Sequence, residues 1–292
     1  MAKINQKVGV LFLRLLQILL IFIGLRGTRL AARCIGNICY YLVPIRKKVV
    51  LENLAAAFPE KPTAELKKIA RRTYQNITIT FSELLLFTSI SKNEMKLLAR
   101  TENVDEMKSL VNENKGVVFW SGHIGSWEVG GSVLGMLFER PIYGLAKKQS
   151  NPVLNEVIKE AREAHGNKLI WLGVSVRHLI EVLRSGGIVG VVGDQRGPAD
   201  SPRVLFFGRP TPFFIGTASI IHKTKCNAIL AAAVREADGN YKGIVEKLSM
   251  ENLPEEPEEQ ILEINQRYAK FLEKVIKQYP DQYFWMHKIW KY

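Results

Sequence analysis

Cysteine is scarce in this chain of 292 residues, which has only Cys34, Cys39 and Cys226. Three cysteines argue against a disulfide scaffold and fit a reducing compartment. Cys34 and Cys39 lie in an apolar helical stretch without a nearby histidine, so we expect them to be buried small side chains rather than zinc ligands.

The motifs of several enzyme classes are also missing. No serine has glycine two residues before and two residues after it, which excludes the nucleophile elbow of α/β-hydrolases. The chain has no Walker A loop, no G-x-G-x-x-G and no H-E-x-x-H. These absences exclude the phosphate-binding loops and the zinc-protease helix that the three motifs build.

Acidic residues are absent from the first 50 positions, which carry nine basic ones. The basic residues are Lys3, Lys7, Arg14, Arg26, Arg29, Arg33, Arg46, Lys47 and Lys48. The rest of the chain has 32 basic and 28 acidic residues, so it supplies only +4 of the net charge of +13. Because the basic excess coincides with the most apolar stretch, it favours contact with an anionic membrane over binding of nucleic acid.

That apolar stretch covers residues 8–25 and is interrupted by Arg14 and Gln17. A spanning helix needs about 20 apolar residues, and Arg14 lies near enough to one end to snorkel. A cleaved signal peptide is disfavoured, because no small-x-small site follows and Arg33 precedes Cys34. Residues 1–26 are therefore predicted to be a membrane helix that either spans, with the main domain on the cytoplasmic side, or lies flat as an anchor.

The remaining residues, 27–292, are predicted to form one domain. Residues 27–113 have helical patterns without alternating strands, which predicts a helical collar. Residues 114–292 alternate strand and helix patterns, which predicts an α/β core. The fold class is therefore α/β, with a mixed, largely parallel sheet flanked by helices and an N-terminal membrane-associated helical segment. The predicted strands are 116–120, 168–172, 188–192 and 228–234, and the helices in this core begin at Pro152 and cover 176–183, 215–223 and 255–278.

The strongest chemical signal is His123 followed by Glu128, directly after the first of these strands. Imidazole is suited to proton transfer near neutral pH, and a carboxylate can fix its tautomer. With His123 in the turn and Glu128 in the first turn of the next helix, the two side chains can face each other. The alternative is a buried structural histidine beside a glutamate that complements a helix N-terminus.

A second polar turn follows the strand 188–192 and contains Asp194, Gln195 and Arg196. It is predicted at the same sheet edge as His123, where open α/β folds place their ligands. The alternative is a solvated loop in which Asp194 and Arg196 pair with each other. Lys148 and Arg162 could add positive charge for a phosphorylated ligand, and Asn151 with Pro152 is a clear helix start.

Taken together, these stretches resemble the bacterial lipid A biosynthesis acyltransferases, the late lauroyl/myristoyl transferase family. The resemblance rests on residues 46–60, 122–128, 194–198 and 282–288, with further similarity at 151–166 and 206–210. The His-x4-Glu stretch and the tail Gln-Tyr-Phe-Trp-Met-His, residues 282–287, weigh most.

The resemblance implies an enzyme of the bacterial inner membrane whose catalytic domain faces the cytoplasm. Its partners would be acyl carrier protein carrying a fatty acyl thioester, and a glycolipid acceptor with a free hydroxyl. His123 and Glu128 would be the catalytic pair, without metal or soluble cofactor. Substrate binding would involve Lys148, Asn151, Arg162, Asp194, Gln195 and Arg196.

Two alternatives stay open from the sequence. The acceptor could be another membrane glycolipid, such as a phosphatidylinositol mannoside, or an aminolipid. The chain could also be a non-catalytic membrane adaptor on an acyltransferase scaffold, in which case His123 would be dispensable.

Overall fold

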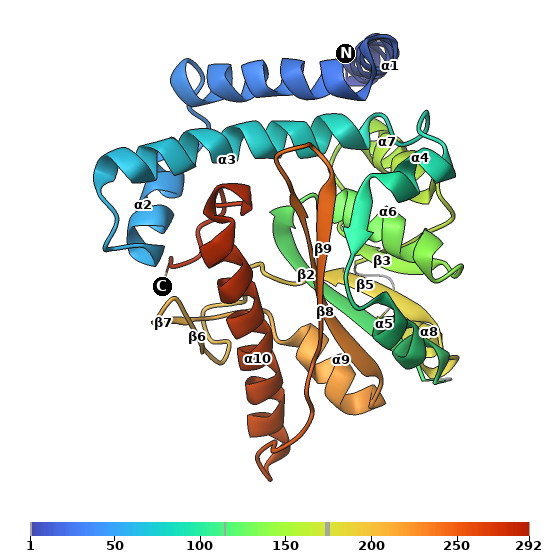
Figure 1. Ribbon diagram of the computed structural model, residues 1–292, viewed down its shortest axis with the longest axis vertical. Helices are drawn as coiled ribbons and strands as arrows, with labels where there is room; N and C mark the ends of the chain where they lie inside the picture. Colours follow the sequence, from blue (N-terminus) through green and yellow to red (C-terminus); the bar gives the residue numbers. More distant parts are fainter. Residues whose placement is uncertain (1, 114, 173–175, 292) are drawn as a thin grey trace.

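A seven-stranded mixed sheet forms the centre of the computed structural model (Figure 1), which describes residues 2–113, 115–172 and 176–291. The strand order is β1-β9-β8-β2-β5-β3-β4. β8 and β9 pair antiparallel, and the other neighbouring strands pair parallel, so the predicted largely parallel sheet is confirmed. The strands of this sheet are β1 Ala99–Thr101, β2 Val117–Gly125, β3 Ile142–Ala146, β4 Lys168–Trp171, β5 Ile188–Val192, β8 Asn227–Arg235 and β9 Tyr241–Lys247.

Helices cover both faces of this sheet (Figure 1). They are α1 Ala2–Tyr41, α2 Lys47–Ala57, α3 Thr63–Leu84, α4 Lys92–Leu97, α5 Val104–Asn112, α6 Trp127–Leu137, α7 Pro152–Glu163, α8 Val176–Arg184, α9 Gly216–Thr224 and α10 Pro257–Gln278, with a 3-10 turn at Pro280–Gln282. A separate hairpin pairs β6 Val204–Phe206 with β7 Arg209–Thr211.

The four predicted strands are all present, and the helices from α7 onward lie where their patterns place them. Two expectations were wrong. The first strand continues to Gly125, so His123 lies at the end of β2 rather than in the turn after it. The segment predicted as purely helical contains β1, which pairs with β9 at the sheet edge. A strand of three residues is too short to produce a periodic pattern.

Alternation along β2 separates two hydrophobic layers. Val118 and Trp120 pack with α8, α9 and α10, and Trp120 stacks on Tyr268 of α10 with ring centroids 4.1 Å apart. Val117 and Phe119 point to the opposite face, where they pack with α5 and the edge of α6. Successive side chains of a strand point to opposite faces, so one strand contributes to both layers.

The N-terminal helix α1 is interrupted close to the predicted boundary near residue 26. It continues to Tyr41 with a kink at Gly24, whose φ of 67° and ψ of 178° are non-helical. The part after the kink lies along α3, and a Cβ at Gly36 would come within 2.6 Å of the Gln75 Cα, so only glycine permits this approach. Cys34 is exposed on this segment, and Cys39 is partly buried, which corrects the expectation that both are buried.

Candidate active site

His123 and Asp194 meet at the carboxyl ends of two neighbouring parallel strands. β2 pairs with β5 up to Ser121 and Val192, and the two polar residues follow these positions. The His123 backbone N–H donates to Asp194 Oδ2 at 2.8 Å, and His123 Nδ1 lies 2.6 Å from Asp194 Oδ1. The predicted placement of both turns at one sheet edge is therefore confirmed.

The carboxylate of Asp194 fixes the tautomer of His123. An ionised carboxylate only accepts hydrogen bonds, so Nδ1 carries the proton and Nε2 of the neutral ring has a free lone pair. Burial disfavours the imidazolium, but the charge of Asp194 and its hydrogen bond outweigh burial and raise the pKa of His123. Burial likewise opposes ionisation of Asp194, yet the interaction with His123 lowers the pKa of that carboxyl.

Glu128, the expected partner of His123, forms its hydrogen bonds elsewhere. Arg162 of α7 donates to it twice, from Nε at 2.8 Å and from Nη2 at 2.6 Å, and Trp127 Nε1 donates at 2.9 Å. The carboxylate on His123 Nδ1 is thus Asp194, which corrects the predicted pairing. Glu128 lies in the first turn of α6, as expected, but α7 packs against this turn and its Arg162 takes the carboxylate.

Gly125 is required for this strand-to-helix turn. Its φ is +60°, a left-handed value that L side chains rarely adopt, and a Cβ would lie 1.9 Å from the carbonyl oxygen of Ala233. Ser126 then caps α6 by accepting a hydrogen bond from the Val129 N–H. The first turn of α6 therefore begins beside His123.

Aromatic rings surround the imidazole of His123. Trp127 packs edge-on with its centroid 4.9 Å away, and Phe284 of the C-terminal tail lies at 5.9 Å. The Phe284 backbone N–H donates to the His123 carbonyl at 2.9 Å, which holds the tail against the end of β2. His287 packs on Phe284, and its pKa is lowered mainly by burial. The site is consequently shielded from water on the side of the tail.

An apolar cavity of about 140 Å³ lies between α6 and the sheet. Trp127, Glu128 and Arg162 line one part of it, next to His123. The rest of its lining comes from α6 and from all seven strands of the sheet, and small residues are prominent in it: Gly130, Gly131, Gly144, Gly190, Ala231, Ala233 and Gly243. Glycine inside a strand marks close approach of a ligand or backbone, and this was the one sequence signal for the cavity.

The remaining predicted binding residues have different positions. Lys148 lies over the ring of Trp171 at 5.9 Å, and Asn151 caps α7 by accepting from the Val153 N–H. Gln195 is exposed and accepts from the Phe214 N–H through its carbonyl, while Arg196 Nη1 donates to the Lys288 carbonyl. Their binding roles remain predictions. Among the residues described, no group of three or more His, Cys, Asp or Glu side chains could hold a metal ion.

Comparison with known proteins identifies the family. The sequence model described as bacterial lipid A biosynthesis acyltransferase matches residues 5–292. Lipid A biosynthesis palmitoleoyltransferase of Escherichia coli is 24% identical over 267 residues, which are 91% of this chain and 83% of the relative. Lipid A biosynthesis lauroyltransferase of the same organism is 22% identical over 263 residues, 88% of this chain and 83% of the relative. The chain belongs to the bacterial lipid A biosynthesis acyltransferase family, and it is an acyltransferase.

Proposed function

We propose that this acyltransferase moves a fatty acyl chain from acyl carrier protein to a hydroxyl of a lipid A precursor at the inner membrane, with His123 as general base. The observation that carries the proposal is the His123–Asp194 pair, whose imidazole packs against Trp127 in the lining of an apolar cavity. The names of the two relatives, both lipid A acyltransferases, support the acceptor class.

The reaction begins with proton transfer to His123. Nε2 takes the proton of the acceptor hydroxyl while the oxygen of this hydroxyl attacks the thioester carbonyl carbon. The tetrahedral intermediate then collapses, the carbon–sulfur bond breaks, and the leaving sulfur takes the proton from Nε2. An ester and a free thiol result, and His123 is neutral again. Asp194 stabilises the transient imidazolium through Nδ1, and a positioned base of this kind supplies about 10²–10⁴-fold in rate.

The negative oxygen of the intermediate needs hydrogen-bond donors. The N-terminus of α6 carries a partial positive charge and begins at Trp127, close to His123. Arg162 lines the cavity and acts electrostatically on His123, and its two hydrogen bonds to Glu128 use Nε and Nη2. We assign the backbone N–H groups at the N-terminus of α6, together with Nη1 of Arg162, as the donors to this oxygen. Glu128 holds Arg162 in place.

The apolar cavity is the proposed site of the acyl chain. Its glycines and alanines leave space where larger side chains would fill the layer between α6 and the sheet. Burying methylene groups there is favourable by about 0.8 kcal/mol each. With the chain in the cavity, the thioester carbonyl comes to rest at the end next to His123, where the acceptor hydroxyl must arrive.

An acyl transfer assay tests this proposal. Purified full-length protein in detergent is given acyl carrier protein thioesters of several lengths and a tetra-acylated lipid A precursor, and the product is weighed by mass spectrometry. We expect a gain of one acyl group and a loss of about 10²–10⁴-fold in rate in His123→Ala. His178→Ala is the matched control, because His178 lies half-exposed on α8 away from the cavity lining.

Each other outcome has a defined meaning. An unchanged rate in His123→Ala would refute the assignment of the base. Folded protein that acylates a phosphatidylinositol mannoside or an aminolipid but not the precursor would move the proposal to another acceptor. Folded protein without transfer to any acceptor would favour the adaptor hypothesis.

A further inference from the structure

The N-terminal helix α1 has one side that the catalytic domain holds with polar contacts. Before the kink at Gly24, Arg14 Nη2 lies 2.7 Å from Glu160 Oε2 of α7. Gln17, which is buried, donates from Nε2 to the Leu85 carbonyl and to Thr88 Oγ1, both at 2.9 Å. These are the two polar residues that interrupt the apolar run, and both bind the domain.

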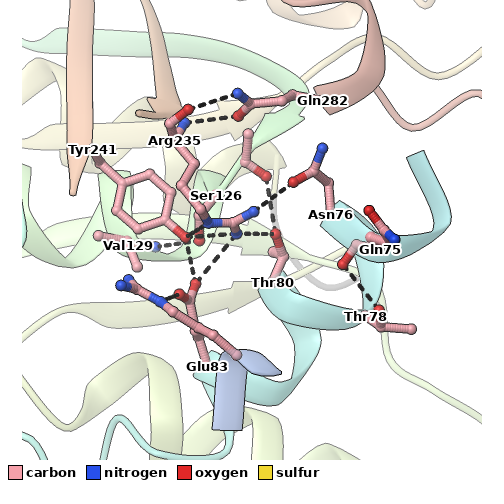
Figure 2. Close-up of polar contacts among 12 residues, drawn as sticks. Gln75, Asn76, Thr78, Thr80, Glu83, Ser126, Val129, Arg235, Tyr241 and Gln282 are labelled. Atoms are coloured by element: carbon pink, nitrogen blue, oxygen red, sulfur yellow. Dashed lines mark hydrogen bonds and ion pairs between the residues drawn. The ribbon is translucent and has the colours of Figure 1, made fainter. Parts of the chain in front are cut away.

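After the kink the attachment is deeper. Arg29 Nε lies 2.6 Å from Glu83 Oε1 of α3. Figure 2 shows Glu83 facing the Tyr241 hydroxyl, at 2.5 Å, and Arg235, whose Nη2 is 3.6 Å away. Glu83 is only 1% exposed, so α1 supplies a charge to an ion cluster buried inside the domain.

The same cluster connects to the C-terminal tail. Gln282 accepts from the Arg235 N–H at 2.7 Å and donates to the Arg235 carbonyl at 2.8 Å (Figure 2). Two residues after Gln282, Phe284 packs against His123. The part of α1 after the kink is therefore connected to the active site through the buried ion cluster and the C-terminal tail.

The opposite side of α1 is apolar and exposed. Phe22 is 88% exposed and Leu30 is 65% exposed, one on each side of the kink. Both parts of α1 lie at the same end of the molecule, at the top of Figure 1. The other large exposed apolar residues of α1 and the following turn are Leu15, Ile18, Leu19, Ile21, Ile23, Ile35, Ile38, Tyr41, Leu42, Val43 and Ile45.

Length and composition alone would let Leu13–Tyr41 cross a membrane. A crossing helix must leave the domain, because polar groups of the domain cannot enter hydrocarbon without a large cost. Departure of the part after Gly24 would remove Arg29 from the buried Glu83. Departure of the part before it would break the contacts of Arg14 and Gln17 and place both side chains in lipid.

We infer that α1 binds an anionic bilayer from one side, lying in the plane of the interface with its apolar side in the lipid, and does not span. Arg26, Arg33, Arg46 and Lys48 are exposed on or next to this side and match the charge of anionic lipid headgroups. This inference does not depend on which lipid accepts the acyl chain.

The in-plane position also brings the active site to the lipid surface. Phe81, on the α3 helix that α1 covers, is about half-exposed and packs edge-on against Trp127 at 6.1 Å. Trp127 in turn contacts His123. The exposed Phe81 and the partly exposed Trp127 therefore lead from α3, the helix next to the anchor, to the catalytic imidazole, and a lipid acceptor reaches it from the same leaflet.

Cysteine labelling of the full chain in bacterial membranes tests the topology. The three native cysteines are replaced by serine, and single cysteines are introduced as A2C or, on the catalytic domain, E251C. A membrane-impermeant maleimide is applied to right-side-out and inverted vesicles. We expect both variants to react in the same vesicle type, with labelling lost in the other. Reaction of A2C and E251C in opposite vesicle types would overturn the inference.

A depth measurement covers the case in which position 2 is shielded by lipid. Spin labels on the F22C and L30C variants are compared in vesicles of phosphatidylethanolamine and phosphatidylglycerol, with E251C as the water-exposed control. In-plane binding places both labels at one shallow depth, about 5–10 Å below the headgroups. A label at position 22 near the bilayer centre would show a spanning helix and overturn the inference. In phosphatidylcholine vesicles, which lack anionic lipid, we expect weaker binding of the protein.

Discussion

The two faces of the central sheet are built from the same strands but packed in opposite ways. On the face covered by α8, α9 and α10, large side chains such as Trp120 and Tyr268 are fully buried in the layer. On the face covered by α6, the strands carry Gly144, Gly190 and Gly243 in the lining of a cavity. Protein interiors are normally packed as densely as organic crystals, so a cavity lined by glycine indicates a place for a ligand.

Asp194→Asn tests the pair at the carboxyl ends of β2 and β5, between the two faces. We expect this substitution to have the largest effect on the rate. The amide can donate a hydrogen bond to Nδ1, which would move the proton of the neutral ring to Nε2 and remove the base. The rate should fall about 10²–10⁴-fold, because the base contributes that much. Steady-state acyl transfer gives the rate, and far-ultraviolet circular dichroism checks the fold. A folded variant with the wild-type rate would contradict the role of Asp194.

Trp120→Ala should reveal the packed face through stability. Trp120 is fully buried and stacks on Tyr268, so the truncation should cost about 3–5 kcal/mol in the free energy of unfolding. Ser121→Ala, one residue further along β2 and lining the cavity, is the control. We expect it to change stability by about 0.5 kcal/mol or less. Denaturant unfolding measures the free energy of unfolding of both variants. Equal losses of stability would contradict the proposed difference between the two faces.

Gly131→Leu should fill the hollow face without loss of stability. A Cβ at Gly131 would have no atom within 4 Å, so the side chain extends into open space along the cavity. We expect the rate ratio of short to long acyl donors to rise about tenfold or more, because the longest chains no longer fit. Competition between donors of different lengths, read by mass spectrometry, measures this ratio.

Gly131→Ala is the matched control for that substitution. It adds one methyl group to α6 and should stabilise the helix by about 1 kcal/mol, with a smaller change in chain-length preference. If Gly131→Leu destabilises the protein as strongly as Trp120→Ala, then this face is packed like the other one, and the cavity is not an acyl site.

The length and apolar content of each strand explain which strands the sequence could predict. The continuous apolar runs of β5 and β8 predict their strands to within a residue or so, because a buried parallel strand needs such a run. β9, whose sequence YKGIVEK mixes charge with β-branched residues, lacks that signal and was missed. β1, with three residues, gives no pattern at all.

The site was predictable only in part for a related reason. Strand order places the turns after β2 and β5 together, so the proximity of His123 and Asp194 follows from the parallel fold. The partner of Glu128 depends on how α7 packs against α6, and spacing along the chain contains no information on that contact. For the same reason the sequence left the course of α1 open, whereas the contacts of Arg29 with Glu83 fix it to the domain.

The smallest expected effect is a shift in pH dependence on neutralising Glu128. His123 must be unprotonated to act as a base, so activity falls as the pH drops through its pKa, which lies above the ordinary value of 6.5. The charge of Glu128 helps to raise this pKa, and that of Arg162 lowers it. Glu128→Gln removes the first and leaves the second uncompensated, so the acid limb of kcat/KM should move to lower pH.

At any one pH this shift should change the rate by less than the tenfold change in donor preference expected for Gly131→Leu, because Asp194, which touches the ring directly, remains in place. Glu181→Gln, on the exposed side of α8, is the control and should leave the limb where it is. An acid limb that moves to higher pH in Glu128→Gln would mean that the titrating group is not His123. Another group at the carboxyl ends of the strands would then have to take the proton of the acceptor hydroxyl.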